Sequence, residues 1–177
     1  MSGSKTGWKL KKMSWSLFKA KMNVLTGPQH ISREQFARTI ADSYHQAMTV
    51  SFDSMTAGGK LVNNAPKYQV FYQTILGHCN ANMGTHQDVD FIKQIGPAVK
   101  AYWIGLMIVG PTGIVTVNNT GTWTAPKVKQ NFDFQIILNA LIAACRTHIM
   151  TLQGKYVSTV VPGVSAPWSG ALFQTLP

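Results

Sequence analysis

The sequence predicts a mainly α-helical fold, a helical bundle of about four to five helices with one inserted β-hairpin and extended N- and C-terminal arms. Three observations predict it. Apolar residues recur at helical spacing in four segments between residues 33 and 153. A short run of β-forming residues interrupts them at 113–126, and residues 155–177 contain three prolines without a helical period. At 177 residues, the chain is long enough to bury one substantial core.

The predicted N-terminal arm, residues 1–27, is basic and carries an apolar stripe. Its first 23 residues hold six lysines and no acid, which accounts for six of the chain's ten net positive charges. A helix would place the apolar residues on one side and most of the lysines elsewhere. The stripe consists of Trp8, Trp15, Phe18, Met22 and Leu25. Gly27-Pro28 ends this segment, because a helix does not easily cross a proline.

The helical domain, predicted at 28–154, begins with a capping box. Ser32 is followed three residues later by Gln35, so that each side chain can bond the other residue's backbone amide. Helical periodicity then continues for about 24 residues, until Gly58-Gly59 stops it. Residues 58–66 are expected to form a loop that leads into the next helix.

Two further helices are predicted at about 67–83 and 88–109. The acidic side chain of Asp88 suits the positive end of a helix dipole, which marks the start of the second of these helices. Gly96-Pro97 interrupts its apolar period, so we expect either a kink there or two shorter helices.

The remaining elements are a hairpin, a last helix and a tail. β-forming residues flank Asn118-Asn119-Thr120-Gly121, which predicts a β-hairpin at about 113–126 that packs on the helices or pairs with another subunit. The helix at about 129–153 is apolar around most of its circumference and is expected to be central and buried. Residues 155–177 are too hydrophobic for a disordered tail and are predicted to lie as an extended arm.

The low charge of the chain indicates that partners cover much of its surface. Charged residues make up 12% of the chain, against roughly 25% in typical globular domains. Soluble monomers usually keep a charged surface. The alternative interpretation is an ordinary uncharged globular domain.

No motif for catalysis, phosphate binding or metal binding is present. Cys79 and Cys145 fit no CxxC or zinc spacing, and each lies in an apolar helical pattern, which favours a reducing compartment. The five histidines form no ligand-like cluster, and the six acids suggest no catalytic pair. We therefore expect no enzymatic activity, no cofactor and no metal. The longest apolar run, 95–109, is shorter than the roughly 18 residues of a membrane span, so no transmembrane helix is expected.

The basic arm has several interpretations. Its lysines could neutralise phosphates while Trp8 and Trp15 stack on bases, but the arm contains no arginine, which grips phosphate best. It could lie on a membrane surface, or be a solvated flexible tail. We favour a fourth interpretation, in which the apolar stripe docks in a groove of a protein partner and the lysines lie at the rim, because two tryptophans are costly to leave in water.

Several stretches of the chain share a recognisable pattern. They are FARTIADSYHQAM with AGGKLVNNAPKYQVF, then VKAYWIGLMIVG, then THIMTLQGKYVSTVVPG with SAPWSG. The pattern covers residues 36–170 and resembles small virion structural proteins of contractile-type or other long-tailed bacteriophages. The resemblance implies a non-enzymatic tail, neck or baseplate component that is made in the host cytoplasm and resides in the virion. It does not include the basic arm and implies no site residues.

We therefore expect a structural subunit of a bacteriophage particle that binds copies of itself and other virion proteins. The alternative is a nucleic-acid-binding or packaging accessory protein that uses residues 1–23. A small hydrolase is the third hypothesis, and the lack of any motif argues against it. The residues predicted to contact partners are Trp8, Lys9, Lys11, Lys12, Trp15, Phe18, Val115, Val117, Trp123 and Trp168.

Overall fold

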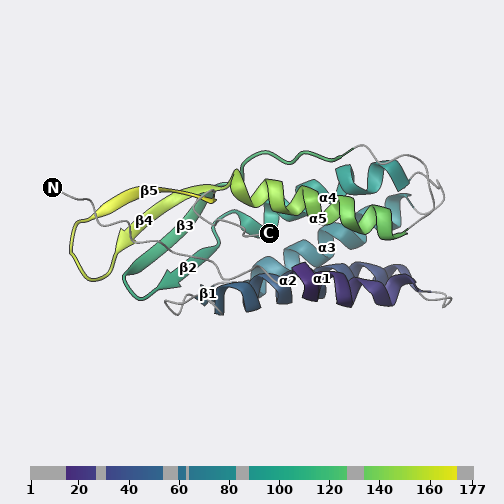
Figure 1. The fold of residues 1–177 in the computed structure, drawn as a ribbon, viewed down its shortest axis with the longest axis horizontal. Helices are drawn as coiled ribbons and strands as arrows, with labels where there is room; N and C mark the ends of the chain where they lie inside the picture. The colour runs from purple at the N-terminus through teal and green to yellow at the C-terminus, as the bar shows by residue number, and fades with distance from the viewer. Residues whose placement is uncertain are drawn as a thin grey trace.

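The computed structural model describes residues 15–26, 31–53, 60–62, 64–82, 88–126 and 134–170. The helices form one end of the molecule, and an antiparallel sheet forms the other end (Figure 1). The helices are α1 (Trp15–Met22), α2 (Arg33–Asp53), α3 (Asn64–Asn82), α4 (Asp88–Trp103) and α5 (Phe134–Met150), with a short 3-10 helix, η1 (Asn23–Thr26), after α1. The strands are β1 (Lys60–Val62), β2 (Met107–Gly110), β3 (Gly113–Asn119), β4 (Gln153–Ser158) and β5 (Ser165–Ser169).

The helices close into a ring around an aromatic core. Each helix packs on the next, and α1 also contacts α5. At the centre, the ring of Tyr44 in α2 lies 5.1 Å from Phe71 in α3 and 5.3 Å from Tyr102 in α4. The indole nitrogen of Trp103 donates a hydrogen bond of 2.7 Å to the Tyr44 hydroxyl, and both side chains are fully buried. One buried hydrogen bond thus joins α2 to α4, and ring contacts bring in α3; the bond costs little because donor and acceptor satisfy each other.

The capping box predicted at the start of α2 is confirmed. The Ser32 amide donates to the Gln35 side-chain oxygen at 3.0 Å, and the Gln35 amide donates to the Ser32 hydroxyl at 3.1 Å. Both bonds satisfy amides that the first turn of a helix leaves free.

The five strands pair in sequence order, β1-β2-β3-β4-β5, each antiparallel to its neighbours. Residues directly opposite each other in adjacent strands project from the same face of a sheet. Leu61, Ile108 and Val115 form one such row and are buried, and Val117 faces Gly154 and Trp168 in the next row. This inner face continues the core of the helices.

The predicted mainly α-helical fold with one hairpin and two extended arms is wrong, because the chain forms an α+β fold with a five-stranded sheet. The predicted helix 88–109 ends at Trp103, and Gly105 with φ of 68° turns the chain into β2. The spacing of the apolar residues in Leu106–Val109 is compatible with a helical turn and with a strand. The run is a strand because β2 pairs with β1 and β3.

The predicted hairpin at 113–126 does not form. Its first half is β3, but β3 pairs with β2 and β4, and residues 120–126 contain no strand. Those residues instead pack against the helices. The Thr122 amide donates a hydrogen bond of 2.9 Å to the hydroxyl of Thr151, the residue directly after α5.

The terminal arms also differ from the prediction. The part of the N-terminal arm that the structure describes is α1, whose Phe18 and Met22 are buried in the core. Residues 153–158 and 165–169 are strands of the sheet rather than an extended tail. The expected loop at 58–66 contributes the short strand β1. Packing against α2 and α5 buries α1, and pairing with β2 and β3 brings β1 and β4 into the sheet; the spacing of residues within each segment does not encode these contacts.

The structure decides two further predictions about helices. The helix α5 is not central, because Ile136 and Met150 on its outer side are exposed. It lies on one side of the bundle in Figure 1. The helix α4 continues through Gly96-Pro97 as one element, which excludes two shorter helices, and the kink stays a prediction.

Gly96 provides the space in which Trp123 packs. A Cβ atom at Gly96 would collide with the indole ring. The indole nitrogen of Trp123 donates to the carbonyl of Ile92 at 3.0 Å, one turn earlier in α4. The other side of the indole meets His148 of α5, with ring centroids 5.6 Å apart. Trp123 therefore links α4 to α5.

His148 is fully buried, and among the described residues neither ring nitrogen has a hydrogen-bond partner of good geometry. Burial lowers the pKa of His148 to about 4; the nearby Thr120 backbone partly opposes this shift, and Lys100 adds to it. The imidazole is consequently neutral at pH 7 in the folded chain.

Replacing Gly96 by alanine should destabilise the protein by about 1–3 kcal/mol, because the indole of Trp123 must move and lose its bond to Ile92. The matched control is Gly77→Ala in α3, where an added Cβ meets nothing within 4 Å. That change should stabilise by about 0.5–1 kcal/mol through helix propensity. Urea unfolding of both variants checks this, and equal shifts of the same sign would contradict the assigned role of Gly96.

Stability should fall as the pH drops from about 6.5 to 4. The unfolded chain binds a proton at His148 near pH 6.5 while the folded chain binds it only near pH 4. This group alone should cost about 3 kcal/mol across that window and nothing above it. Urea unfolding at pH 8, 6 and 4.5 measures the loss. The His148→Leu variant should lack this component, and an unchanged pH dependence in the variant would count against it.

Candidate functional site

One face of the sheet is left open by the residues that the structure describes, and we call it the outer face. By register, Lys60, Val109, Ile114, Val157 and Ser165 form one row across it, and Val62, Met107, Thr116, Lys155 and Pro167 form the next. Val62 and Val157 are exposed, and Met107, Val109 and Ile114 are half-buried. The outer face therefore carries a contiguous row of β-branched and apolar side chains that the described part of the chain does not cover.

The loop between β4 and β5, residues 159–164, extends this apolar surface. It lies at the end of the sheet far from the helices (Figure 1). Four valines within eight residues are exposed: Val157 by 45%, Val160 by 63%, Val161 by 52% and Val164 by 46%. Exposed apolar side chains that gather in one place are typical of interaction surfaces.

Hydrogen bonds hold this loop in a defined shape. The Ser158 hydroxyl accepts bonds from the Val161 amide at 2.9 Å and the Val160 amide at 3.3 Å. The Ser158 amide donates to the Val164 carbonyl at 2.9 Å, and the Thr159 amide donates to the Thr112 carbonyl at 3.0 Å. The valines are thus presented on an ordered turn, which lowers the entropy cost of binding.

Both edges of the sheet are protected against strand addition. The edge strand β1 is only three residues long and carries Lys60. The other edge strand, β5, contains Pro167, which has no amide to donate. Short edges, lysine and proline are the features by which proteins avoid edge-to-edge pairing. The outer face and its loop, rather than the edges, are therefore the accessible surface of this sheet.

The charges around the outer face are positive. Lys60 and Lys155 project from it, and both are exposed. After Asp90 the one acidic residue in the sequence is Asp133, which falls between β3 and β4, so β2 to β5 contain no acid. Among the described residues, no ion pair joins either lysine to a carboxylate.

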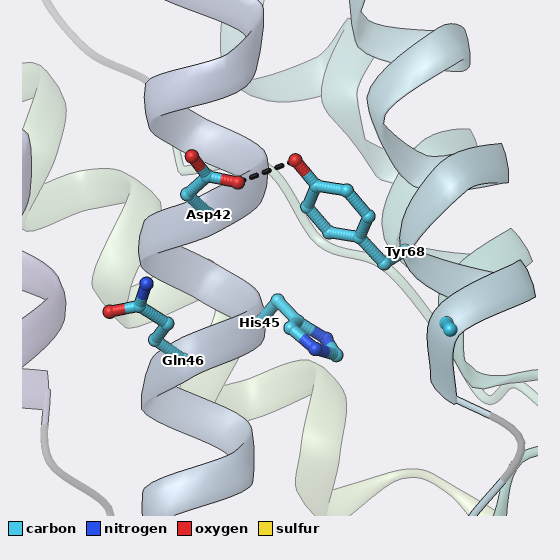
Figure 2. Close-up of a pocket in the computed structure, with 5 residues that line it drawn as sticks. Asp42, His45, Gln46 and Tyr68 are labelled. Atoms are coloured by element: carbon cyan, nitrogen blue, oxygen red, sulfur yellow. Dashed lines mark hydrogen bonds between the residues drawn. The ribbon is translucent and has the colours of Figure 1, made fainter.

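A small pocket of about 330 Å³ opens between α2 and α3, lined by Asp42, His45, Gln46, Ala65 and Tyr68. Asp42 and His45 project from α2 toward Tyr68 of α3 (Figure 2). The Tyr68 hydroxyl donates to Asp42 at 2.5 Å, and His45 Nδ1 and the Tyr102 hydroxyl of α4 are 3.0 Å apart. The pocket residues therefore tie α2 to α3 and α4.

Burial governs the titration of this pocket. It lowers the pKa of His45, and the negative charge of Asp42 partly opposes that shift. Burial and the bond to Asp42 raise the pKa of Tyr68 to about 12, so the phenol keeps its proton. The pocket offers one carboxylate and no Cys or Ser nucleophile. Among the described residues, no three His, Cys, Asp or Glu side chains gather as a metal site. The arrangement supports helix packing more than chemistry.

Most residues predicted to contact partners are used inside the chain. Phe18, Val115, Val117 and Trp168 are buried in its own core, Trp15 is half-buried against it, and Trp123 packs between α4 and α5. Buried side chains are not free to touch a partner in this conformation. Trp8, Lys9, Lys11 and Lys12 lie outside the described residues, so their contacts stay a prediction.

Sequence reasoning missed the outer face and its valine loop. The alternation of β4 and the sequence Val160-Val161-Pro162-Gly163-Val164 are local signals for a strand and a turn. These local signals predict a strand and a turn, but they do not show which strands pair. The register that aligns Val109, Ile114 and Val157 across three strands follows only from the pairing.

Comparison with known proteins identifies no relative. No family model matches the chain, and neither the curated proteins nor the solved structures contain a significant match. Across the described residues, none of the helices combines the length and hydrophobicity that crossing a membrane requires.

Replacing Asp42 by asparagine should lower the pKa of His45 further, because the negative charge that favours the imidazolium is removed. Titration of the imidazole by NMR measures this shift. A rise in the pKa would contradict the assigned coupling. Asn119→Asp on β3, which neither lines the pocket nor acts on the pKa of His45, is the control and should leave the His45 titration unaltered.

Proposed function

We propose that the chain is a non-enzymatic structural subunit of a bacteriophage particle, in its tail, neck or baseplate. The observation that supports a structural role is the exposed, ordered apolar surface formed by the outer face and the β4–β5 loop. The pattern at residues 36–170 is what points to a phage particle in particular.

The energetics favour a role in a repeated contact. Burying a whole valine side chain gains about 1.5 kcal/mol, so covering four half-exposed valines gains about 3 kcal/mol. A single contact of that size is weak once the entropy of association is subtracted. In a symmetric assembly many copies engage together, and multivalency makes weak contacts sufficient.

The protected edges indicate how neighbours meet. Because β1 is short and β5 contains Pro167, a neighbour packs on the outer face instead of extending the sheet. Face-to-face packing of this kind suits β-branched side chains, which interdigitate across a layer about 10 Å thick.

Mass spectrometry of particles purified from the source of this sequence tests the proposal. The chain should be present in stoichiometric ratio to the other particle proteins. A stable monomer that is absent from particles and binds DNA with a steep salt dependence would overturn it in favour of a nucleic-acid-binding protein.

The double variant Val160→Ser with Val161→Ser should reduce incorporation into particles at least about tenfold, because the loop loses its apolar contact. The matched control is Val24→Ser with Val70→Ser, two valines that are 70% and 48% exposed elsewhere on the chain. Urea unfolding should show that both variants remain folded. Equal incorporation of the two variants would remove the loop from the assembly surface.

A further inference from the structure

We propose that the outer face and the β4–β5 loop bind an acidic protein surface, one that presents an apolar stripe flanked by carboxylates. This inference rests on the docking surface of the proposed function and adds the chemistry of the partner. Three properties of the surface carry it: its apolar row, its pair of lysines and its lack of aromatic side chains.

The apolar row defines the centre of the footprint. Val109, Ile114 and Val157 are direct neighbours on β2, β3 and β4, and Val62 and Met107 lie beside them in the next row. The ordered valines at 160, 161 and 164 continue the surface at its far end. The outer face as a whole, on five strands spaced about 4.8 Å apart, is about 19 Å wide, which accommodates one helix or a facing sheet on its apolar centre.

The two lysines define the charge of the partner. Lys60 stands at the β1 end of the first row and Lys155 on β4 in the second, so that three strand spacings, about 14 Å, separate them across the apolar centre. A partner that places carboxylates at those two positions satisfies both, and one that places lysines there is repelled. Complementary charges at an interface contribute more to the choice of partner than to the affinity of binding.

A second copy of the chain fits this surface poorly. Each copy has a net charge of +10, and β2 to β5 contain no acid that could form an ion pair with the lysines of the other copy. A face-to-face dimer would therefore oppose positive charges across an apolar contact. The surrounding positive charge also steers acidic partners to the face.

A lipid surface fits less well than a protein. Segments that lie in the membrane interface typically use Trp, Phe and Leu. The outer face and residues 159–164 contain none of these; Tyr156 and Trp168 project from the inner face, where Trp168 is buried. The β-branched composition is typical of packing between sheets.

Two synthetic amphipathic helical peptides test the proposal on the full-length chain. They share one Leu/Ile stripe, which glutamates flank in the first peptide and lysines flank in the second. The chain should bind the glutamate peptide at least about tenfold more tightly, with a preference that weakens as salt rises. In NMR titrations the shifted amides should be those of Val109, Ile114, Lys155 and Val157.

The variant Lys60→Glu with Lys155→Glu should reverse the preference and bind the lysine peptide more tightly. The control, Lys21→Glu with Lys93→Glu, makes the same change of net charge on helices α1 and α4 and should keep the wild-type preference. Equal binding of both peptides, or binding of neither, overturns the proposal. A reversal in the control as well would show that net charge acts instead of this face, which also overturns it.

Two further measurements address the other occupants. Binding to phosphatidylglycerol vesicles that is lost in the Val160→Ser, Val161→Ser variant, without peptide binding, would overturn the proposal in favour of a lipid surface. Dimerisation that the same variant abolishes would overturn it in favour of a second copy.

The particle assay separates this proposal from the proposed function. If the valine variant is excluded from particles while the Lys60→Glu, Lys155→Glu variant enters normally, the docking surface stands and the acidic partner falls. If both variants enter normally, the chain is still a particle component, whereas the docking surface and its acidic partner both fall.

Discussion

The hydrogen bond from the Trp103 indole to the Tyr44 hydroxyl is the contact on which the rest of the structure depends. It anchors the last residue of α4 to the middle of α2, inside an aromatic cluster that also includes Phe71 and Tyr102. Two residues later Gly105 turns the chain, and its amide donates to Val117 at 2.8 Å. The position of Trp103 therefore determines where the sheet begins. Helix bundle and sheet share one core for this reason.

That shared core gives the two faces of the sheet different roles. The inner face is used up by packing, because Leu61, Ile108, Val115 and Trp168 complete the core. The outer face keeps apolar side chains that no described element covers, next to an ordered loop of exposed valines. An apolar surface that remains after the core is complete is the strongest sign of function in this chain, and the pocket of Asp42, His45 and Tyr68 is better explained by helix packing.

The sequence allowed the helices to be predicted closely and the sheet hardly at all. The capping box at Ser32 and Gln35 and the four body helices depend on contacts within a few residues, which spacing reveals. The strands β2 and β4 lie in segments that resemble a helix end and a tail. Each forms a hairpin with the strand that follows it, but its other partner, β1 for β2 and β3 for β4, is distant in sequence. The candidate site was missed for the same reason. The sequence pattern predicts Trp123 and Trp168 as partner contacts, whereas in the structure Trp123 packs between α4 and α5 and Trp168 is buried in the core.

The sequence by itself determined the basic N-terminal segment, the low overall charge and the position of each body helix, since composition and local hydrogen bonding are properties of neighbouring residues. Only the tertiary structure decided that five short segments form one sheet and that the valines at 157–164 remain outside the core. The face on which a strand residue lies depends on its register with strands far away in the chain, and a one-residue change of register would exchange the two faces.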